Sequence, residues 1–225
     1  MDAAVESPIK RKLMPGGVLW LEREGEVYKK AYGKRAIVPR CEPMTLGTIF
    51  DAASLTKVVA TTPCILKLVE DRRISLDDKI TSYLPEFSGD PNKPAVTIRH
   101  LLTHTSGLLP GIRKGFEWHS HETGIALATS ESSRGHAGYD YAYSDINFIL
   151  LGEIVRRVTG QSLSSYAQLT IFGPLRMTET GFQPKVDDIT RIAPTTRMED
   201  GHVLRGTVHD PTARAMGGEA GHAGL

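Results

Sequence analysis

The sequence predicts a mixed α/β (α+β) protein, in which an antiparallel sheet is flanked by helices and joined to a mostly helical region. Three observations support this class: a β-hairpin pattern at 16–34, an apolar helix at about 55–71 and a long helical pattern at 143–175. No strand pattern follows the last of these. Because two strands cannot form a stable sheet alone, we expect the C-terminal strands of the fold to be missing from this chain.

The hairpin is the first predicted element. Val18, Trp20 and Val27 lie in runs of residues that favour strands. Glu24-Gly25 lies between the two runs and supplies the turn.

The apolar helix at about 55–71 follows the hairpin. Lys67, Glu70 and Asp71 form its polar rim, and Pro63 is expected to kink it. Its broad apolar surface predicts a buried helix and comes from Val58, Val59, Cys64, Ile65, Leu66, Leu68 and Val69.

The middle of the chain gives weaker patterns. A short helix is predicted over 97–103, and Ser106-Gly107 forms the turn that ends it. Residues 112–138 are rich in Gly, Ser and His, so we expect a long surface excursion there.

The segment 143–175 carries the clearest helical pattern. Ser144 is a suitable N-cap for its first helix, which Gly160 ends. Ser162 is placed to cap a second helix, which stops before Gly173.

The composition excludes several classes of function. A formal net charge of +1 gives no reason to expect nucleic acid as a partner, and two cysteines make no disulfide framework. No apolar run is long enough for a transmembrane helix, and the first residues lack the apolar core of a signal peptide. We therefore expect a cytoplasmic protein as given, or a periplasmic or secreted one whose leader has been removed. The sequence leaves the oligomeric state open.

A serine and a lysine at the start of the apolar helix are the first candidates for chemistry. Ser54 and Lys57 are separated by one helical turn, which puts them about 60° apart on a helix, so the amine can reach the hydroxyl. Apolar walls disfavour a charged amine, and a neutral amine can take the serine proton. The simpler interpretation is a capping serine and a solvated lysine. Ser7 and Lys10 repeat the same spacing in a polar setting, so spacing alone is a weak signal.

Such a pair also needs a group that returns a proton to the leaving atom. Tyr143, at the start of the strongest helical pattern, is the natural candidate. Tyr139 and Tyr141 precede it, and an aromatic residue near a helix start commonly serves packing.

Four segments in order resemble the serine β-lactamase and penicillin-binding protein family, in the branch of class C β-lactamases, DD-peptidases and family VIII esterases. They are "FDAASLTKVVATT", "LLTHTSGL", "YSDINFILLGEIVRRVTGQSL" and "FGPLRMTETGF". The resemblance implies a serine hydrolase that acts through an acyl-enzyme. It implies neither a cofactor nor a metal. By resemblance, Ser54 is the nucleophile, Lys57 its base and Tyr143 the proton shuttle.

The second motif departs from the family pattern at Asp145, where an Asn is usual. An Asn amide donates to a substrate carbonyl, whereas a carboxylate only accepts. The change disfavours tight recognition of a β-lactam side chain and leaves room for esters or for substrates that bear an amine. Asn147 lies two residues further on and is not expected to replace it.

The third motif of the family, Lys/His-Thr/Ser-Gly, is not present. His222-Ala223-Gly224 imitates it weakly, which makes His222, Gly224 and Asp145 the candidate substrate-binding residues. We expect one β-lactamase-like domain over 1–225, truncated before the last part of the fold. Its parts are a hairpin and nucleophile helix (15–72), a mostly helical region (73–205) and a Gly-rich return segment (206–225).

Other classes of function were weighed against this one. His100 and His104 lack the Glu of a zinc-binding H-E-x-x-H motif, and no G-x-S-x-G elbow of an α/β-hydrolase occurs. His209-Asp210 is expected to be a structural pair in a loop. The serious alternative is a non-catalytic or weakly acylated ligand-binding module on the same fold. The expected ligands are small esters, β-lactams or peptides, and fold alone does not choose among them.

Overall fold

A three-stranded antiparallel sheet in the order β1-β2-β3 carries the N-terminal part of the chain. Its strands are β1 (Gly16–Arg23), β2 (Glu26–Ala36) and β3 (Glu42–Pro43). The β1–β2 hairpin pairs Gly16 with Gly33 and Arg23 with Glu26. Glu24 and Gly25 both have positive φ, of 54° and 84°, which is the conformation of a type I′ turn. The predicted hairpin and its turn are confirmed.

The structure, a computed structural model, describes residues 2–113 and 117–225 and divides into two units. The first unit holds Met1–Asp51 and Pro184–His209, and the second holds Ala52–Gln183 and Asp210–Leu225. Residues 1 and 114–116, within the predicted domain, lie outside the described residues. The prediction of a single domain stays a prediction.

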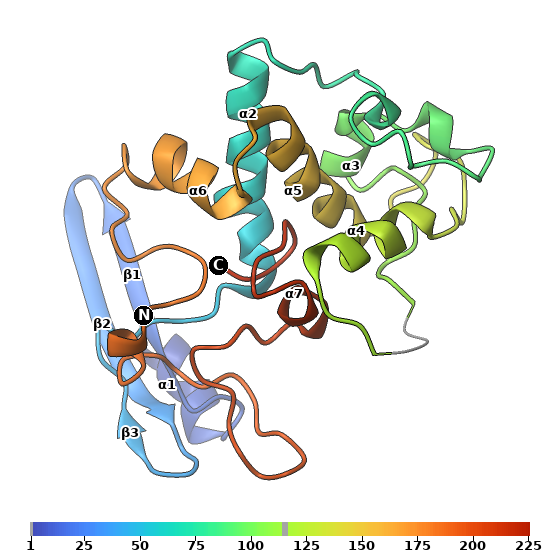
Figure 1. Cartoon of the computed structure of the whole chain (residues 1–225). Helices are drawn as coiled ribbons and strands as arrows, with labels where there is room; N and C mark the ends of the chain where they lie inside the picture. Colours follow the sequence, from blue (N-terminus) through green and yellow to red (C-terminus); the bar gives the residue numbers. More distant parts are fainter. Residues whose placement is uncertain (1, 114–116) are drawn as a thin grey trace. The chain divides into compact units, whose positions relative to one another are not determined.

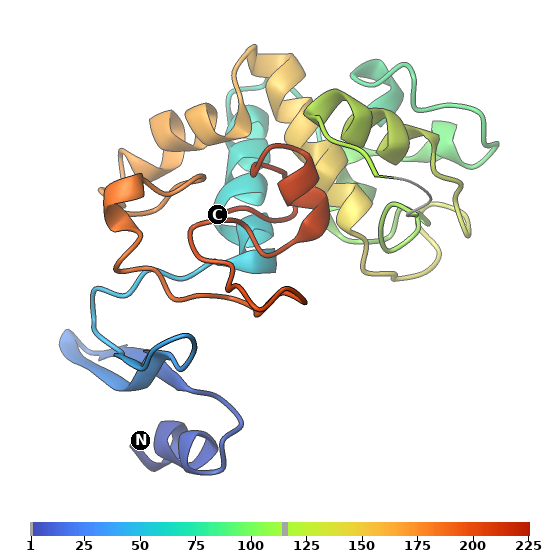
Figure 2. The same ribbon diagram turned by 60° about the horizontal axis from the view of Figure 1, so that its bottom comes forward.

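In the first unit, helix α1 (Asp2–Lys10) lies beside the hairpin (Figure 2). The Asp2 carboxylate accepts from Tyr28 Oη at 2.5 Å and from Lys30 Nζ at 2.6 Å. The sequence analysis did not predict this helix, because Pro8 and the mixed polarity of the segment hide the helical pattern. Residues from the later part of the chain join this unit through a parallel bridge between Ile49 and Ile192.

The second unit is built around helix α5 (Asp145–Thr159), which contacts four neighbouring helices (Figure 1). Ser144 caps α5 by accepting from the Asn147 amide, and Gly160 ends it in the left-handed region at φ 73°. Ten consecutive residues of α5 are buried, from Ile146 to Val155. Around it lie α2 (Thr62–Glu70), α3 (Ile98–Leu102), α4 (His121–Ser130), α6 (Leu163–Ala167) with its π-helical extension η5 (Gln168–Phe172), and α7 (Pro211–Ala215).

The helix predicted at about 55–71 is interrupted. A 3-10 turn, η1 (Ala53–Leu55), leads into a π-helical turn, η2 (Lys57–Thr61), and the regular helix α2 begins only at Thr62. Pro63 follows the π turn and has no N–H to donate, so the break falls where the hydrogen-bond ladder loses a donor. Cys64, Ile65 and Leu68 are fully buried, as the apolar pattern predicts.

The prediction of an open excursion over 112–138 was wrong for part of its length. Ser120 caps helix α4, and Ile125, Ala128 and Thr129 are buried. The helix was missed because its alanines and small polar residues give a weak amphipathic pattern.

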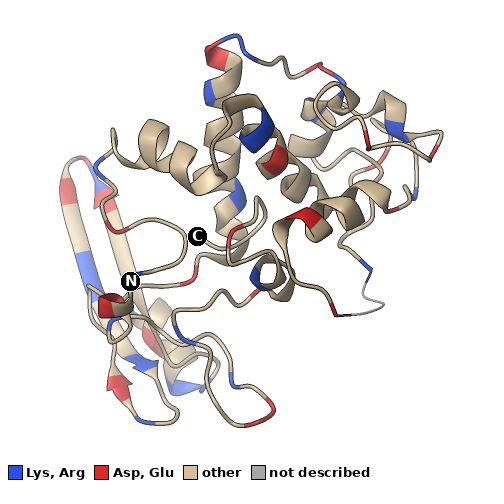
Figure 3. Cartoon of the chain, viewed as in Figure 1, with Lys and Arg blue, Asp and Glu red and all other residues tan. Residues whose placement is uncertain are grey.

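Helices α3 and α5, the caps of α5 and the mixed α/β class are confirmed. Helix α3 ends at Leu102 with Thr103 as its C-cap, before the predicted turn at Ser106-Gly107. In the described ranges, no named strand follows β3. None of the helices in the described part of the chain has both the length and the apolar character needed to span a bilayer. Figure 3 shows positive and negative residues interspersed along both units, in keeping with a formal net charge of +1.

Candidate active site

The predicted pair lies where the chain enters the first turns before α2. The Lys57 ammonium nitrogen, Nζ, donates to Ser54 Oγ at 2.9 Å. Lys57 is 3% exposed, whereas Ser54 is exposed. Ala53, the residue before Ser54, has φ 46°, a left-handed conformation that costs a residue with a Cβ on the order of 1 kcal/mol. A buried amine therefore faces an exposed hydroxyl on a strained turn.

Lys57 has two further oxygen neighbours. Its Nζ donates to the carbonyl oxygen of His222 at 3.1 Å and lies 2.8 Å from Asp145 Oδ1. The Asp145 contact has the distance of an ion pair but lacks the alignment of a hydrogen bond. The Lys57 amine thus lies between two hydrogen-bond acceptors and one carboxylate.

Aromatic rings form the wall beside Lys57. Its Nζ lies 4.9 Å from the centroid of the Tyr143 ring and 5.8 Å from that of Phe148. Tyr143 thus meets the lysine through the face of its ring. The predicted shuttle residue is at the site and 44% exposed, and in the described residues its hydroxyl has no hydrogen bond to Ser54 or Lys57.

His104 holds the start of α5 in place. Its Nδ1 accepts from the Ser144 amide at 3.1 Å and from Asn147 Nδ2 at 3.2 Å. Its ring lies 4.5 Å from that of Tyr143. Burial, and then the charge of Lys57, lowers the pKa of His104, which keeps this ring a neutral acceptor. Sequence reasoning had treated His104 only as a possible metal ligand.

Asn147 does not take the place of Asp145 in the second motif, as predicted. It is fully buried, and its Oδ1 accepts from Ser106 Oγ at 2.6 Å. Asp145 and Asn147 therefore point to different surroundings, and only Asp145 reaches Lys57.

Residues 217–225, which we call the Gly-rich loop, lie beside the nucleophile segment (Figure 2). Hydrogen bonds join the two segments. Ala52 N donates to Leu225 O at 2.8 Å, Leu225 N donates to Thr56 Oγ1 at 3.1 Å, and Thr61 Oγ1 donates to Gly221 O at 2.6 Å. Together with the Lys57–His222 bond, these contacts make the Gly-rich loop one wall of the site.

A buried His–Asp pair fixes this loop. His222 Nε2 lies 2.9 Å from Asp210 Oδ1, and Asp210 also caps α7 by accepting from the Ala213 amide. Burial raises the pKa of Asp210, but the hydrogen bond and charge of His222 outweigh it and hold that pKa at about 2. Asp210, predicted as part of a structural pair His209-Asp210, thus caps α7 and pairs with His222. A signal for the cap existed, since Asp followed by Pro is typical of a helix start, but nothing in the sequence indicated His222 as the partner of Asp210.

Gly224 lies in the same loop at φ 118°. A Cβ there would lie 2.6 Å from the Gly218 carbonyl oxygen, so this position requires glycine for the loop itself. The structure thus brings Ser54, Lys57, Tyr143, Asp145 and His222 together, with Gly224 supporting the loop beside them.

The residues that could hold a metal ion are Asp145, Asp210 and His222, whose ligand atoms lie within 4.8 Å of one another. The ammonium of Lys57 already lies against Asp145. A divalent cation at the same carboxylate would repel that charge, so the donor set fits an ion pair better than a metal.

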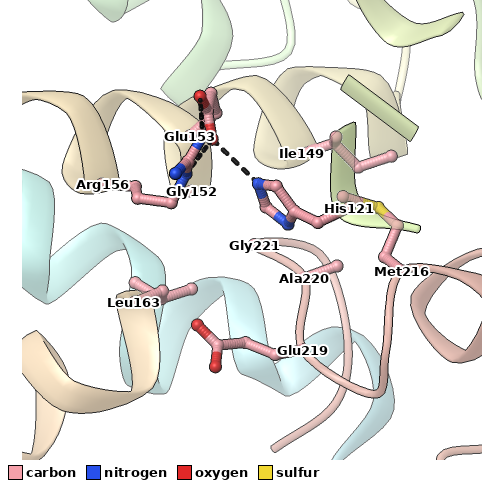
Figure 4. Close-up of a pocket in the computed structure, with 10 residues that line it drawn as sticks. All are labelled: His121, Ile149, Gly152, Glu153, Arg156, Leu163, Met216, Glu219, Ala220 and Gly221. Carbon is pink, nitrogen blue, oxygen red and sulfur yellow. Dashed lines mark hydrogen bonds and ion pairs between the residues drawn. The ribbon is translucent and has the colours of Figure 1, made fainter. Parts of the chain in front are cut away.

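A second set of polar residues surrounds a cavity of about 20 Å³ that Ala220 and Gly221 of the Gly-rich loop help to line (Figure 4). Glu153 of α5 is fully buried there, 2.9 Å from His121 Nε2 and 2.7 Å from both Arg156 Nε and Arg157 Nε. Burial raises the pKa of Glu153, but these partners together lower it to about 2. The cluster joins α4 to α5 and thereby supports the helix that carries Asp145.

Comparisons with known proteins identify the family. Residues 1–225 match the family model described as Beta-lactamase. The chain is 32% identical to the N-acetylmuramyl-L-alanine amidase of Bacillus subtilis (98% of this chain, 58% of that protein). It is 33% identical to a putative D-alanyl-D-alanine carboxypeptidase of Escherichia coli (88% of this chain, 54% of that protein). The chain thus spans about half the length of the curated relatives it matches.

Solved structures give the same class. An octameric penicillin-binding protein homologue from Pyrococcus abyssi superposes with a TM-score of 0.77 at 26% identity (99% of this chain, 52% of that one). The hydrolase EstCE1 superposes with a TM-score of 0.80 at 24% identity (99% and 67%), which shows the shared fold. The fold and the site define a protein of the β-lactamase and penicillin-binding type. The chain belongs to the Beta-lactamase family, and this family implies a serine hydrolase.

Proposed function

We propose that this chain carries the nucleophile of a serine hydrolase that cleaves an ester or amide through an acyl-enzyme on Ser54. The observation that carries the proposal is the 2.9 Å contact between the buried Lys57 amine and the exposed Ser54 hydroxyl. The names of the relatives, an amidase and a putative carboxypeptidase, support acyl transfer from an amide. Small esters, β-lactams and D-amino-acid peptides are the substrate classes we propose.

In the proposed reaction, Ser54 Oγ bonds to the acyl carbon while the bond from that carbon to the leaving oxygen or nitrogen breaks. The serine proton passes to Lys57 and then, through Tyr143, to the leaving atom. Water then attacks the acyl-enzyme, releases the acid and restores the Ser54 hydroxyl. Asp145, His222 and Gly224 are proposed to border the substrate.

The Asp145 carboxylate beside Lys57 favours a second candidate. A carboxylate at this distance favours the charged form of a lysine, and a charged lysine is not a base, so the same pocket could bind a ligand without turning it over. This ligand-binding module stays an alternative to the hydrolase.

Hydrolysis of p-nitrophenyl butyrate separates the two candidates. We expect turnover by the parent chain and a loss of roughly 1,000-fold or more in Ser54→Ala, as for other serine nucleophiles. Ser7→Ala, the matched control from the other Ser–Lys spacing, should keep the parent rate. A folded parent chain without turnover, or a Ser54→Ala variant as active as the parent, contradicts the proposal.

A further inference from the structure

Asp145 has an oxygen that the rest of the site leaves unused. Its Oδ1 is buried 2.8 Å from Lys57 Nζ, yet that contact is a charge pair without the alignment of a hydrogen bond. The side chain as a whole is 34% exposed. In the described part of the chain, no group donates a hydrogen bond to its Oδ2. The carboxylate is thus partly open to solvent and lies beside Lys57, whose Nζ also donates to the Ser54 hydroxyl.

The charges near this oxygen favour a cation. Asp210 offers a second carboxylate within 4.8 Å of Asp145, and His222 belongs to the same group. Lys57 pairs with Asp145 and lies over the Tyr143 ring, and the charge of Asp145 acts on His104. The histidine of the group, His222, already pairs with Asp210. A carboxylate accepts hydrogen bonds only, and its hydrogen bonds from charged donors are the strongest.

We propose that Asp145 is a specificity-determining residue that selects acyl substrates bearing a protonated amine close to the reacting carbonyl. This inference rests on the proposed function, and it names the class of substrate for the same site. The ammonium of the substrate donates to Asp145 Oδ2 while the acyl carbon lies against Ser54 Oγ.

The same contact acts on Lys57. A substrate ammonium at Asp145 competes with Lys57 for that carboxylate, which leaves the lysine with Ser54 Oγ and the His222 carbonyl as its hydrogen-bond partners. A neutral amine has two N–H bonds and one lone pair. It can donate one N–H to the His222 carbonyl and direct its lone pair at the Ser54 hydroxyl, which then donates its proton to the amine. The amine therefore promotes the chemical step as well as binding, and we expect it to raise kcat and to lower KM.

Paired p-nitroanilides that differ only in the amine test the proposal. Glycyl, β-alanyl and γ-aminobutyryl p-nitroanilides are compared with the acetyl, propionyl and butyryl compounds in the parent, Asp145→Asn and Asp187→Asn. Asp187 is an exposed residue of the first unit, so its variant matches the change in net charge away from the site. We expect at least one aminoacyl compound to exceed its partner by about tenfold or more in kcat/KM, the effect of one charge-assisted contact.

The variants decide the role of Asp145. In Asp145→Asn the ratio of kcat/KM between each aminoacyl compound and its acyl partner should fall toward one. Asp187→Asn should keep the ratio of the parent. In the parent the preference should fade above about pH 8, where α-amino groups lose their proton. A parent ratio near one, or a ratio unchanged in Asp145→Asn, overturns the inference. If p-nitrophenyl butyrate is still hydrolysed in a Ser54-dependent way, only this inference fails; if no such hydrolysis occurs, the proposed function fails with it.

Discussion

His104 shows how one side chain sets the position of several others. Its Nδ1 serves the Ser144 amide and Asn147, and its ring packs on Tyr143, so the start of α5 and the aromatic wall depend on a single imidazole. His104 also has φ 56°, a region in which Asn is tolerated. This position can therefore be changed without straining the backbone.

We predict that His104→Asn lowers the free energy of unfolding by about 1–3 kcal/mol through the lost ring packing and removes a pH dependence. Burial lowers the pKa of His104 in the folded state, so the unfolded chain binds its proton more tightly. Stability of the parent should thus fall as pH drops below the unfolded pKa of about 6.5. Urea unfolding at pH 7.5 and 5.5 measures the free energy of unfolding of both proteins. If parent and variant lose the same amount of stability between these two pH values, His104 is not the source of the pH dependence.

At the scale of elements, the Gly-rich loop approaches α5 closely. A Cβ at Gly221 would lie 1.9 Å from the Phe148 carbonyl oxygen, and one at Gly152 would lie 3.0 Å from Gly221 Cα. Both glycines are therefore needed for the loop to reach the nucleophile segment.

Gly221→Ala is expected to displace the loop, because the obstacle is backbone and cannot rotate away. We predict a loss of about 1–3 kcal/mol in the free energy of unfolding and a large loss of turnover, since His222 moves away from Lys57. Gly181→Ala, where a Cβ meets nothing within 4 Å, is the matched control. Urea unfolding and ester hydrolysis of both variants check this, and a Gly221→Ala variant that matches the control refutes it.

The Glu153 cluster links two helices through charge. The pKa of the Glu153 carboxyl is about 2 in the folded state, below the ordinary value of 4.5, so the unfolded chain binds this proton more tightly. The stability that this carboxylate contributes is complete above pH 4.5 and is lost as pH falls toward 2.

We predict that Glu153→Gln costs about 3 kcal/mol at pH 7, because two arginines lose a buried partner, and that it flattens the fall in stability between pH 4.5 and 2. The exposed Glu26→Gln should behave like the parent. Urea unfolding across this pH range provides the measurement. Parallel curves for parent and Glu153→Gln rule out the cluster as a source of acid sensitivity.

For the whole molecule, sequence reasoning succeeded where the signal is local. The hairpin turn at Glu24-Gly25, the caps of α5 and the Ser54–Lys57 contact all depend on residues within a few positions of one another. It failed where the partner is distant: the Lys57–His222 and Thr61–Gly221 bonds join residues 165 and 160 positions apart, and no pattern encodes them. Helix α4 was missed because its small residues give a weak local pattern. Pro63 predicted a break in the apolar helix, but not the form of that break, the π turn η2.

The central claim is that Ser54 becomes acylated, and covalent labelling tests it most directly. The intact parent chain is treated with a fluorophosphonate, and the adduct is located by peptide mass spectrometry, with Ser54→Ala and Ser7→Ala alongside. We predict a single adduct on Ser54 in the parent and in Ser7→Ala, and none in Ser54→Ala. A folded parent chain that takes no label, or that carries it on another residue, contradicts the account.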